Sequence, residues 1–182
     1  MIIVAIDETN LERAIELVDN LDPKKCMLKI GSVTFNSIGK EIIFYVADKG
    51  FDIFLDLKLH DIPNTVKKSI QGLASLPIKM LTIHISGGKD MMMAAMEAVS
   101  ETQIKVFGVT ALTSLSDDEI NEIFQRTSSE QVNAMLDLAE SVALMVLYVH
   151  HTNLSLLKKE ARFYQLLLAL DFKIQMMIKK EL

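Results

Sequence analysis

The chain has 182 residues, of which 50% are hydrophobic and 24% are charged, and its formal net charge at pH 7 is −5. This composition is typical of one acidic globular domain, and it excludes a disordered chain and a strongly basic nucleic-acid binder. The apolar runs are too short to span a bilayer, and the first residues do not have the pattern of a signal peptide. The single cysteine fits a reducing compartment, so we expect a cytoplasmic protein with no membrane or nucleic-acid partner.

Short apolar runs alternate with amphipathic segments through the first part of the chain. A continuous apolar run is typical of a strand buried on both faces, and apolar residues at helical spacing indicate an amphipathic helix. The predicted strands are residues 2–6, 26–30, 52–57, 79–85 and 103–109. The predicted helices are one opened by the capping-box pattern of Thr9 and Glu12, then 35–49 closed by Gly50, 64–76, 90–100, and one opened by the capping box of Ser116 and Glu119.

Strands that alternate with helices imply βα units and a parallel sheet. Five such units fit either a doubly wound sheet or a (β/α)8 barrel of which this chain holds only a part. The first predicted strand is followed by Asp7-Glu8-Thr9, where a phosphate-binding loop would be rich in glycine. A dinucleotide-binding or P-loop fold is therefore not expected.

Charged residues stand at the carboxyl ends of three successive apolar strands. Asp7 ends the first, Lys29 the second, and Asp56 and Lys58 the third, with Asp61 just beyond. These ends share one face of a parallel β/α fold, where active sites are assembled. Because buried charges are costly unless they are paired, a network of lysines and aspartates is predicted. It fits either a structural ion-pair cluster or a catalytic site, and the catalytic interpretation is favoured.

The spacing of Asp56 and Lys58 predicts how their side chains point. Residues two apart on a strand face the same side, so both should face the mouth of the barrel. Leu57, between them, should point into the surrounding layer of helices.

The block from Phe54 to Thr65 reads FLDLKLHDIPNT, and it closely resembles the signature of the bacterial-type orotidine 5′-phosphate decarboxylase family. Shorter segments fit the same family in order and approximate spacing: VAID at 4–7, LKIG at 28–31, IHISGG at 83–88 and VTALTS at 109–114. The resemblance covers roughly residues 2–141. Related sugar-phosphate barrels share a bare Asp-x-Lys-x-x-Asp but not the His-Asp-Ile-Pro-Asn-Thr continuation.

This resemblance implies a (β/α)8 TIM barrel that forms a homodimer with its active sites near the interface. The reaction would convert orotidine 5′-monophosphate (OMP) to uridine 5′-monophosphate (UMP) and carbon dioxide in pyrimidine biosynthesis, with no metal and no cofactor. By the matching motif, Lys58 would protonate the pyrimidine C6, and Asp56 would lie against the substrate carboxylate. Lys29 and Asp61 would complete the alternating array, with Asp61 serving the partner's site.

The resemblance also implies a set of substrate-binding residues. Asp7, together with Lys29, would hold the ribose hydroxyls. Ile62 and Thr65 would reach across the dimer interface, as Asp61 does. Thr113 and Ser114 would meet the base.

The family pattern stops after Ser141. A sixth strand ending near Cys-Ser, a strand ending in Thr-Pro-Gly-Ile-Arg and a final Gly-Arg element should follow, and the last two grip the substrate phosphate. None of these motifs occurs, and no glycine or proline follows Gly108. We therefore divide the chain into an incomplete barrel of five to six βα units at 1–141 and an aberrant tail at 142–182.

The genetic code offers an explanation for this tail. Codons can be chosen for 165–172 so that reading two bases later yields Val-Thr-Pro-Gly-Ile-Arg-Phe. Codons for 143–153, read at the same offset, yield Ile-Asp-Gly-Ile-Val-Cys-Ser-Pro-His-Glu. Two ordered family motifs in one shared frame are hard to obtain by chance. The hypothesis is a frameshift near 140–142, which would leave the decarboxylase activity of this chain impaired.

Other interpretations stay open. The chain could be another sugar-phosphate barrel enzyme, such as a metal-dependent decarboxylase or aldolase, or a non-catalytic remnant of the family. Among the histidines, His60 is expected to form structural hydrogen bonds, and His84 could be structural or functional. A metal site at His150 and His151 is disfavoured, because adjacent strand residues face opposite ways.

Overall fold

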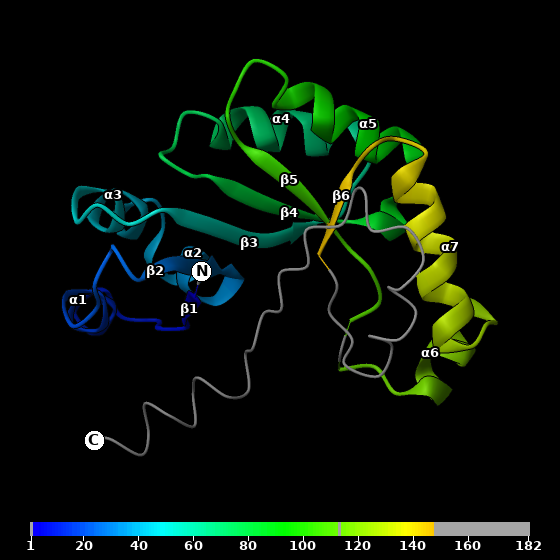
Figure 1. The fold of residues 1–182 in the computed structure, drawn as a ribbon, viewed down its shortest axis with the longest axis horizontal. Helices are drawn as coiled ribbons and strands as arrows, with labels where there is room; N and C mark the ends of the chain where they lie inside the picture. Colours follow the sequence, from blue (N-terminus) through cyan, green and yellow to red (C-terminus); the bar gives the residue numbers. More distant parts are fainter. Residues whose placement is uncertain (1, 113, 148–182) are drawn as a thin grey trace.

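The computed structural model describes residues 2–112 and 114–147, which form one curved parallel sheet with helices around its outer face (Figure 1). The strands are β1 (Ile2–Ile6), β2 (Cys26–Gly31), β3 (Ile53–Leu59), β4 (Met80–His84), β5 (Lys105–Val109) and β6 (Met145–Leu147). The helices are α1 (Leu11–Asp19), α2 (Ser32–Ile38), α3 (Glu41–Asp48), α4 (Pro63–Leu73), α5 (Lys89–Ala98), α6 (Asp117–Phe124) and α7 (Ser128–Glu140), with a 3-10 turn, η1 (Ile85–Gly87), after β4.

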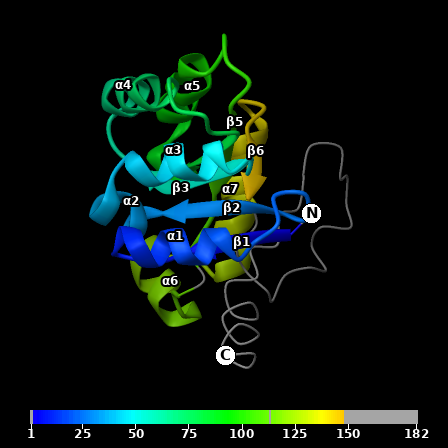
Figure 2. The same ribbon diagram turned by 90° about the vertical axis from the view of Figure 1, so that its left-hand side faces the viewer.

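The strand order decides between the two predicted folds. The strands lie in the order β1-β2-β3-β4-β5-β6, and each neighbouring pair is parallel. A doubly wound sheet would reverse its order partway, whereas a (β/α)8 barrel keeps the order of the chain. Figure 2 shows the arrangement from the side, with α1 and α3 nearest the viewer. The prediction of an incomplete barrel is confirmed for the described residues.

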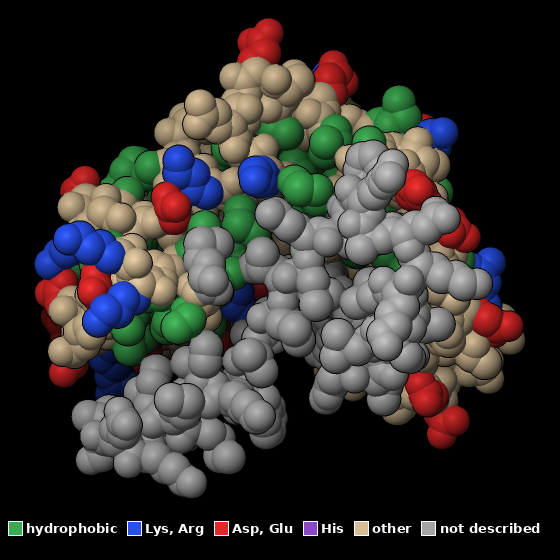
Figure 3. All heavy atoms as spheres, viewed as in Figure 1, with side chains coloured by type: hydrophobic (Ala, Val, Ile, Leu, Met, Phe, Trp, Pro, Cys, Tyr) green, Lys and Arg blue, Asp and Glu red, His purple; other side chains and the backbone are tan. Residues whose placement is uncertain are grey.

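The two faces of the sheet pack differently. The main core joins the outer face to the helices and includes Ile30, Leu55 and Leu81. A second cluster lies on the inner face and contains Met27, Phe54, Met80, Phe107 and Val109. Charged side chains cover the helices at both sides of the view in Figure 3, as expected for helix faces that point to solvent. No helix among the described residues is long and apolar enough to cross a membrane.

The alternation along each strand places polar residues on the inner face as well. Lys29 follows Met27 by two residues, Asp56 follows Phe54, and Thr82 follows Met80. Side chains two apart on a strand share a face. The polar side chains therefore lie above the apolar cluster, toward the carboxyl ends of the strands.

One predicted helix is wrong in its extent. Residues 35–49 form two helices, α2 and α3, because Gly39 adopts a φ of 83° that interrupts the helical backbone. The predicted end at Gly50 is confirmed. Its φ is 85°, and its N–H donates to the carbonyl of Ala47 at 2.8 Å, as a residue just past a helix terminus does.

The residues that cap α1, α6 and α7 can be compared with the predicted capping boxes. Asn10, and not Thr9, caps α1 by accepting a hydrogen bond from the N–H of Arg13, so the helix begins one residue later than predicted. The capping box at Ser116 is confirmed. A further capping box, formed by Thr127 and Glu130, opens α7, which the sequence analysis did not resolve as a separate helix.

The sixth strand lies beyond residue 141, where the sequence resemblance ends. Met145 is in register with Phe107, and Leu144 and Val146 are buried in the main core. The described part of the sheet therefore extends to 147. The division into a barrel segment at 1–141 and a tail at 142–182 stays a prediction.

The packing of β5 against this last segment gives a first testable prediction. A Cβ added to Gly108 would lie 2.6 Å from Ile85 Cγ1 and 2.8 Å from Leu144 Cδ2. Gly108→Ala should therefore lower the free energy of unfolding by about 1–3 kcal/mol. In the matched variant Gly72→Ala, the new methyl group meets nothing within 4 Å in α4, so a gain of about 0.5–1 kcal/mol is expected. Urea denaturation of both variants measures this, and equal stabilities would contradict the packing described for β5.

Candidate active site

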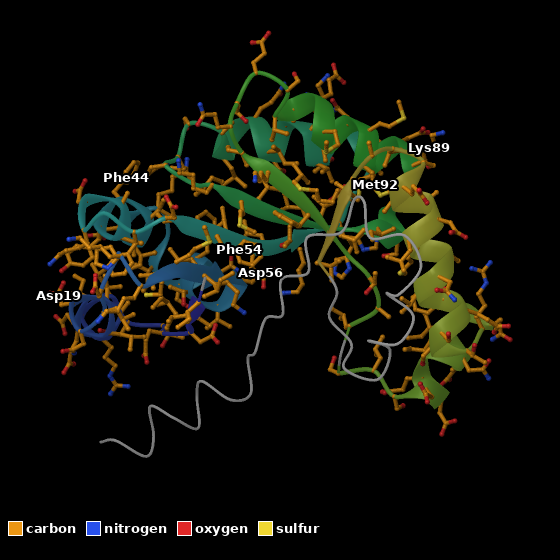
Figure 4. The ribbon with its side chains drawn as sticks, in the orientation of Figure 1. Asp19, Phe44, Phe54, Asp56, Lys89 and Met92 are labelled. Atoms are coloured by element: carbon orange, nitrogen blue, oxygen red, sulfur yellow. The ribbon has the colours of Figure 1, made fainter. Side chains whose placement is uncertain are left out.

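Three charged side chains meet at the carboxyl ends of β2 and β3. The Lys58 ammonium donates to Asp56 Oδ2 at 2.7 Å, and Lys29 Nζ lies 3.6 Å from the same oxygen. The side chains of Asp56 and Lys29 are only 6% and 8% exposed, whereas that of Lys58 is 32% exposed. The predicted network of these three residues is present. Figure 4 shows Asp56 beside Phe54 on β3.

The burial of these groups explains their pairing. A carboxylate withdrawn from water needs compensating charge and hydrogen bonds, and Asp56 has two lysines for this purpose. Both ammonium groups lie against the same carboxylate oxygen, Oδ2. The more exposed Lys58 is the member that can reach a ligand.

The backbone that presents Lys58 is irregular. The pairing of β3 with β4 changes register between Leu55 and Leu59, and Lys58 has a φ of 49°. A β-bulge of this kind re-aims a side chain and is common beside active sites. Asp56 and Lys58 thus meet as predicted, although the strand between them is not regular. Leu57 packs against the main core, which confirms its predicted direction.

Thr82 on β4 is a site residue that the sequence analysis missed. It is fully buried, and its hydroxyl donates to Asp56 Oδ1 at 2.8 Å. The hydroxyl oxygen of Thr82 in turn accepts a hydrogen bond from the backbone N–H of Lys58 at 2.9 Å. The available signal was one polar residue in the otherwise apolar run Met80–Ile83, two positions after the inward-facing Met80.

Asp61 lies outside this network within one chain. It is exposed on the loop after β3, and its Oδ1 accepts a hydrogen bond from the N–H of Ile62 at 2.7 Å. Among the described residues, no ion pair links it to Lys29 or Lys58. Asp61 therefore faces solvent, and its place in the array stays a prediction.

The remaining predicted residues sit around the same edge of the sheet. Asp7 is exposed after β1, with its Oδ1 3.6 Å from the position of a Cβ on Gly31, at the end of β2. Ile62 caps α4 and Thr65 lies in its first turn, and both are exposed. Ser114 is exposed in the loop after β5. Thr113 lies outside the described residues.

Two histidines lie next to Lys58. The rings of His60 and His84 are 5.2 Å apart between centroids and tilted by 42°. Burial lowers the pKa of the half-buried His84, and electrostatic repulsion from His60 and Lys58 lowers it further, against the opposing effect of Asp56. These surroundings therefore favour the uncharged form of the His84 imidazole beside Lys58.

Among residues 2–112 and 114–147, no three side chains of His, Cys, Asp or Glu are grouped so that they could hold a metal ion. His150 and His151, for which a metal site was disfavoured, lie outside this part of the chain.

Comparison with known proteins identifies relatives of this fold and site. Residues 1–174 match the family model described as orotidine 5′-phosphate decarboxylase / HUMPS family. The chain is 44% identical over 146 residues to an orotidine 5′-phosphate decarboxylase from Saccharophagus degradans, covering 79% of this chain and 61% of that protein. It is also 44% identical over 144 residues to one from Ehrlichia canis, covering 79% of this chain and 63% of that protein. The chain thus spans about three fifths of the length of the curated relatives it matches.

Solved structures show the same fold. The crystal structure of orotidine 5′-phosphate decarboxylase from Lactobacillus acidophilus matches with a TM-score of 0.74 and 35% identity, over 80% of this chain and 70% of that one. An uncharacterized conserved protein from Geobacillus kaustophilus matches with a TM-score of 0.75 and 30% identity, over 81% of this chain and 73% of that one.

The environment of His84 predicts a pH effect. Its pKa lies below the ordinary value of about 6.5, so the unfolded chain takes up the proton first as the pH falls. The contribution of His84 to stability is therefore complete above about pH 6.5 and is lost as the pH falls through the lower pKa of the folded state. An NMR titration of the ring protons measures this pKa. His60→Gln should raise the pKa of His84, because the repulsion from His60 is removed. An unshifted pKa of His84 in the unsubstituted protein would contradict the described burial.

Proposed function

The chain belongs to the orotidine 5′-phosphate decarboxylase / HUMPS family, and from this membership we propose that its site converts OMP to UMP and carbon dioxide. The observation that carries the proposal is the buried Asp56 carboxylate held between Lys29 and Lys58. These side chains come from the two segments that match the family motifs, LKIG and FLDLKLHDIPNT.

The geometry suits the proton transfer that this reaction needs. When the bond between C6 and the carboxylate breaks, carbon dioxide leaves and the electron pair stays on C6. A proton from the Lys58 ammonium then forms the new C6–H bond. Asp56 holds that ammonium at 2.7 Å, so the donor is positioned before the charge develops. No metal or cofactor takes part in the proposed step.

The substrate-binding roles are proposed on the family motif. Asp7 and Lys29 hold the ribose hydroxyls, and Thr113 and Ser114 meet the base. In a homodimer, Asp61, Ile62 and Thr65 reach the partner's site. The exposure of Asp61, Ile62 and Thr65 within one chain supports this assignment, because residues that serve a partner must be free at the surface. The proposed compartment is the cytoplasm.

We further propose that turnover is impaired in the chain as written. The motifs that grip the substrate phosphate in this family are absent from the sequence. Binding energy from a remote phosphate stabilises the transition state as well as the bound substrate, so its loss lowers both kcat and affinity. The frameshift near 140–142 supplies the cause.

The family match leaves a second activity to be tested. The matched model also covers the HUMPS proteins, so a metal-dependent decarboxylase or aldolase acting on another sugar phosphate is the alternative enzyme. Metal-dependent turnover of such a substrate, without turnover of OMP, would favour it. A folded protein with neither activity would favour a non-catalytic remnant.

Sequencing the source DNA tests the frameshift. We expect a reading frame offset by two bases that encodes the Cys-Ser and Thr-Pro-Gly-Ile-Arg motifs beyond codon 142. Restoring this frame should raise OMP decarboxylation well above that of the 182-residue chain. A well-supported single frame without those motifs, or near-normal turnover by the present chain, would contradict the proposal.

Substitution of Lys58 tests its role. In the restored protein, Lys58→Ala should lower kcat by about 10²–10⁴-fold, because the proton donor is removed. Lys68→Ala removes an exposed lysine from α4 and should leave kcat unchanged. Decarboxylation is followed as carbon dioxide release. Equal rates for the two variants would rule out Lys58 as the proton donor.

A further inference from the structure

The hydroxyl of Thr82 joins the two residues on which the proposed reaction depends. It donates one hydrogen bond to Asp56 Oδ1 and accepts another from the backbone N–H of Lys58. A hydroxyl has one donor proton and two acceptor lone pairs, so it can make both bonds at once. The side chain is 0% exposed, so no solvent molecule can replace it from outside.

The hydrogen bond that Thr82 accepts lies where the regular pairing of β3 with β4 is interrupted. Phe54 and Leu55 pair with Met80 and Leu81, and pairing resumes only at Leu59. Across this interruption the N–H of Lys58 donates to the side chain of Thr82 instead of to a backbone carbonyl. Buried N–H groups are costly when they have no acceptor, so the hydroxyl stabilises the bulged backbone.

This backbone is unusual at Lys58. Its φ of 49° is left-handed, a region that residues other than glycine enter at a cost. The bond from the Lys58 N–H to Thr82 fixes this conformation from the neighbouring strand. The same conformation directs the Lys58 side chain back to Asp56, which lies only two residues earlier.

The hydrogen bond that Thr82 donates gives the two carboxylate oxygens of Asp56 different partners. Oδ1 accepts from Thr82, which leaves Oδ2 for the ammonium groups of Lys58 and Lys29. These separate partners of Oδ1 and Oδ2 fix the plane of the carboxylate. Without the hydroxyl, Asp56 could rotate and turn either oxygen toward the lysines.

We propose that Thr82 is a positioning residue that fixes the Asp56 carboxylate and the Lys58 backbone in one arrangement through a single hydroxyl. The proposal rests on the function proposed above only in treating Asp56 and Lys58 as the reacting pair. The arrangement itself can be measured without turnover.

Three substitutions isolate the hydroxyl. Thr82→Val keeps the shape of the side chain and removes both hydrogen bonds, and Thr82→Ser keeps the hydroxyl. Thr34→Val is the matched control, because Thr34 is equally buried and its hydroxyl donates to the carbonyl of Ile6 at 2.7 Å. It removes a buried hydrogen bond away from Asp56 and Lys58, so it reports the general effect of such a loss.

The first readout is hydrogen exchange of the Lys58 amide, followed by NMR in the 182-residue chain. We expect exchange about tenfold faster in Thr82→Val, and unchanged exchange in Thr82→Ser and Thr34→Val. The Asp56 carboxyl carbon should shift in Thr82→Val only. Unchanged Lys58 exchange in a folded Thr82→Val protein, or faster exchange in Thr82→Ser, would overturn the proposal.

The unsubstituted protein gives a second measurement that does not depend on any variant folding. A buried, hydrogen-bonded Thr82 hydroxyl proton should be protected from exchange and give a cross-peak to the Lys58 amide proton. Absence of that contact would overturn the proposal.

Decarboxylation of OMP by the protein with the restored frame tests whether this positioning affects the reaction. In Thr82→Val, kcat should fall by about 10²-fold with a smaller change in KM, and Thr82→Ser should recover most of it. Loss of activity in Thr82→Ser equal to that in Thr82→Val would overturn the positioning role. Absence of turnover in the unsubstituted 182-residue chain fits the impairment proposed above, whereas absence in the protein with the restored frame would count against the proposed function. In both cases the Lys58 amide exchange decides on Thr82.

Discussion

The site depends on one constraint, the cost of burying the charge of Asp56. Its carboxylate is withdrawn from water at the end of β3, and an isolated charge there would strongly destabilise the fold. Two lysines and a threonine hydroxyl compensate it. Because these partners come from β2, β3 and β4, the carboxylate can be satisfied only when the three strands are in their observed register. The buried charge of Asp56 is therefore compensated only in the folded arrangement of these three strands.

The inner face of the sheet provides the setting for this cluster. Below the charged residues, Met27, Phe54, Met80 and Phe107 form an apolar floor that keeps water away from one side. A charge in such surroundings interacts more strongly with its neighbours than it would in water. The partly exposed Lys58 stands at the boundary between this floor and the solvent, where a ligand can meet it.

The sequence predicted the parts of this architecture that depend on chain-local patterns. Apolar runs located five strands within a few residues of their observed bounds, and charges at strand ends indicated the site. The sequence did not predict contacts between residues that lie far apart along the chain. The role of Thr82 depends on the register of β3 against β4, and the bulge at Lys58 on a backbone angle that lysine rarely adopts. Gly39 breaks a helix whose apolar pattern runs on through it, and such a pattern does not reveal the backbone angle of one glycine.

The sequential strand order has a consequence for how the chain folds during synthesis. Each strand from β2 to β6 pairs with the strand made just before it, so the sheet can grow in the order in which the ribosome delivers its residues. Contacts between neighbours in sequence close short loops and form early. The Asp56 cluster is complete once β4 has joined, at residue 84, well before the segment after 141 is made. A change of reading frame after codon 141 would therefore alter none of the residues Lys29, Asp56, Lys58 and Thr82 that form this cluster.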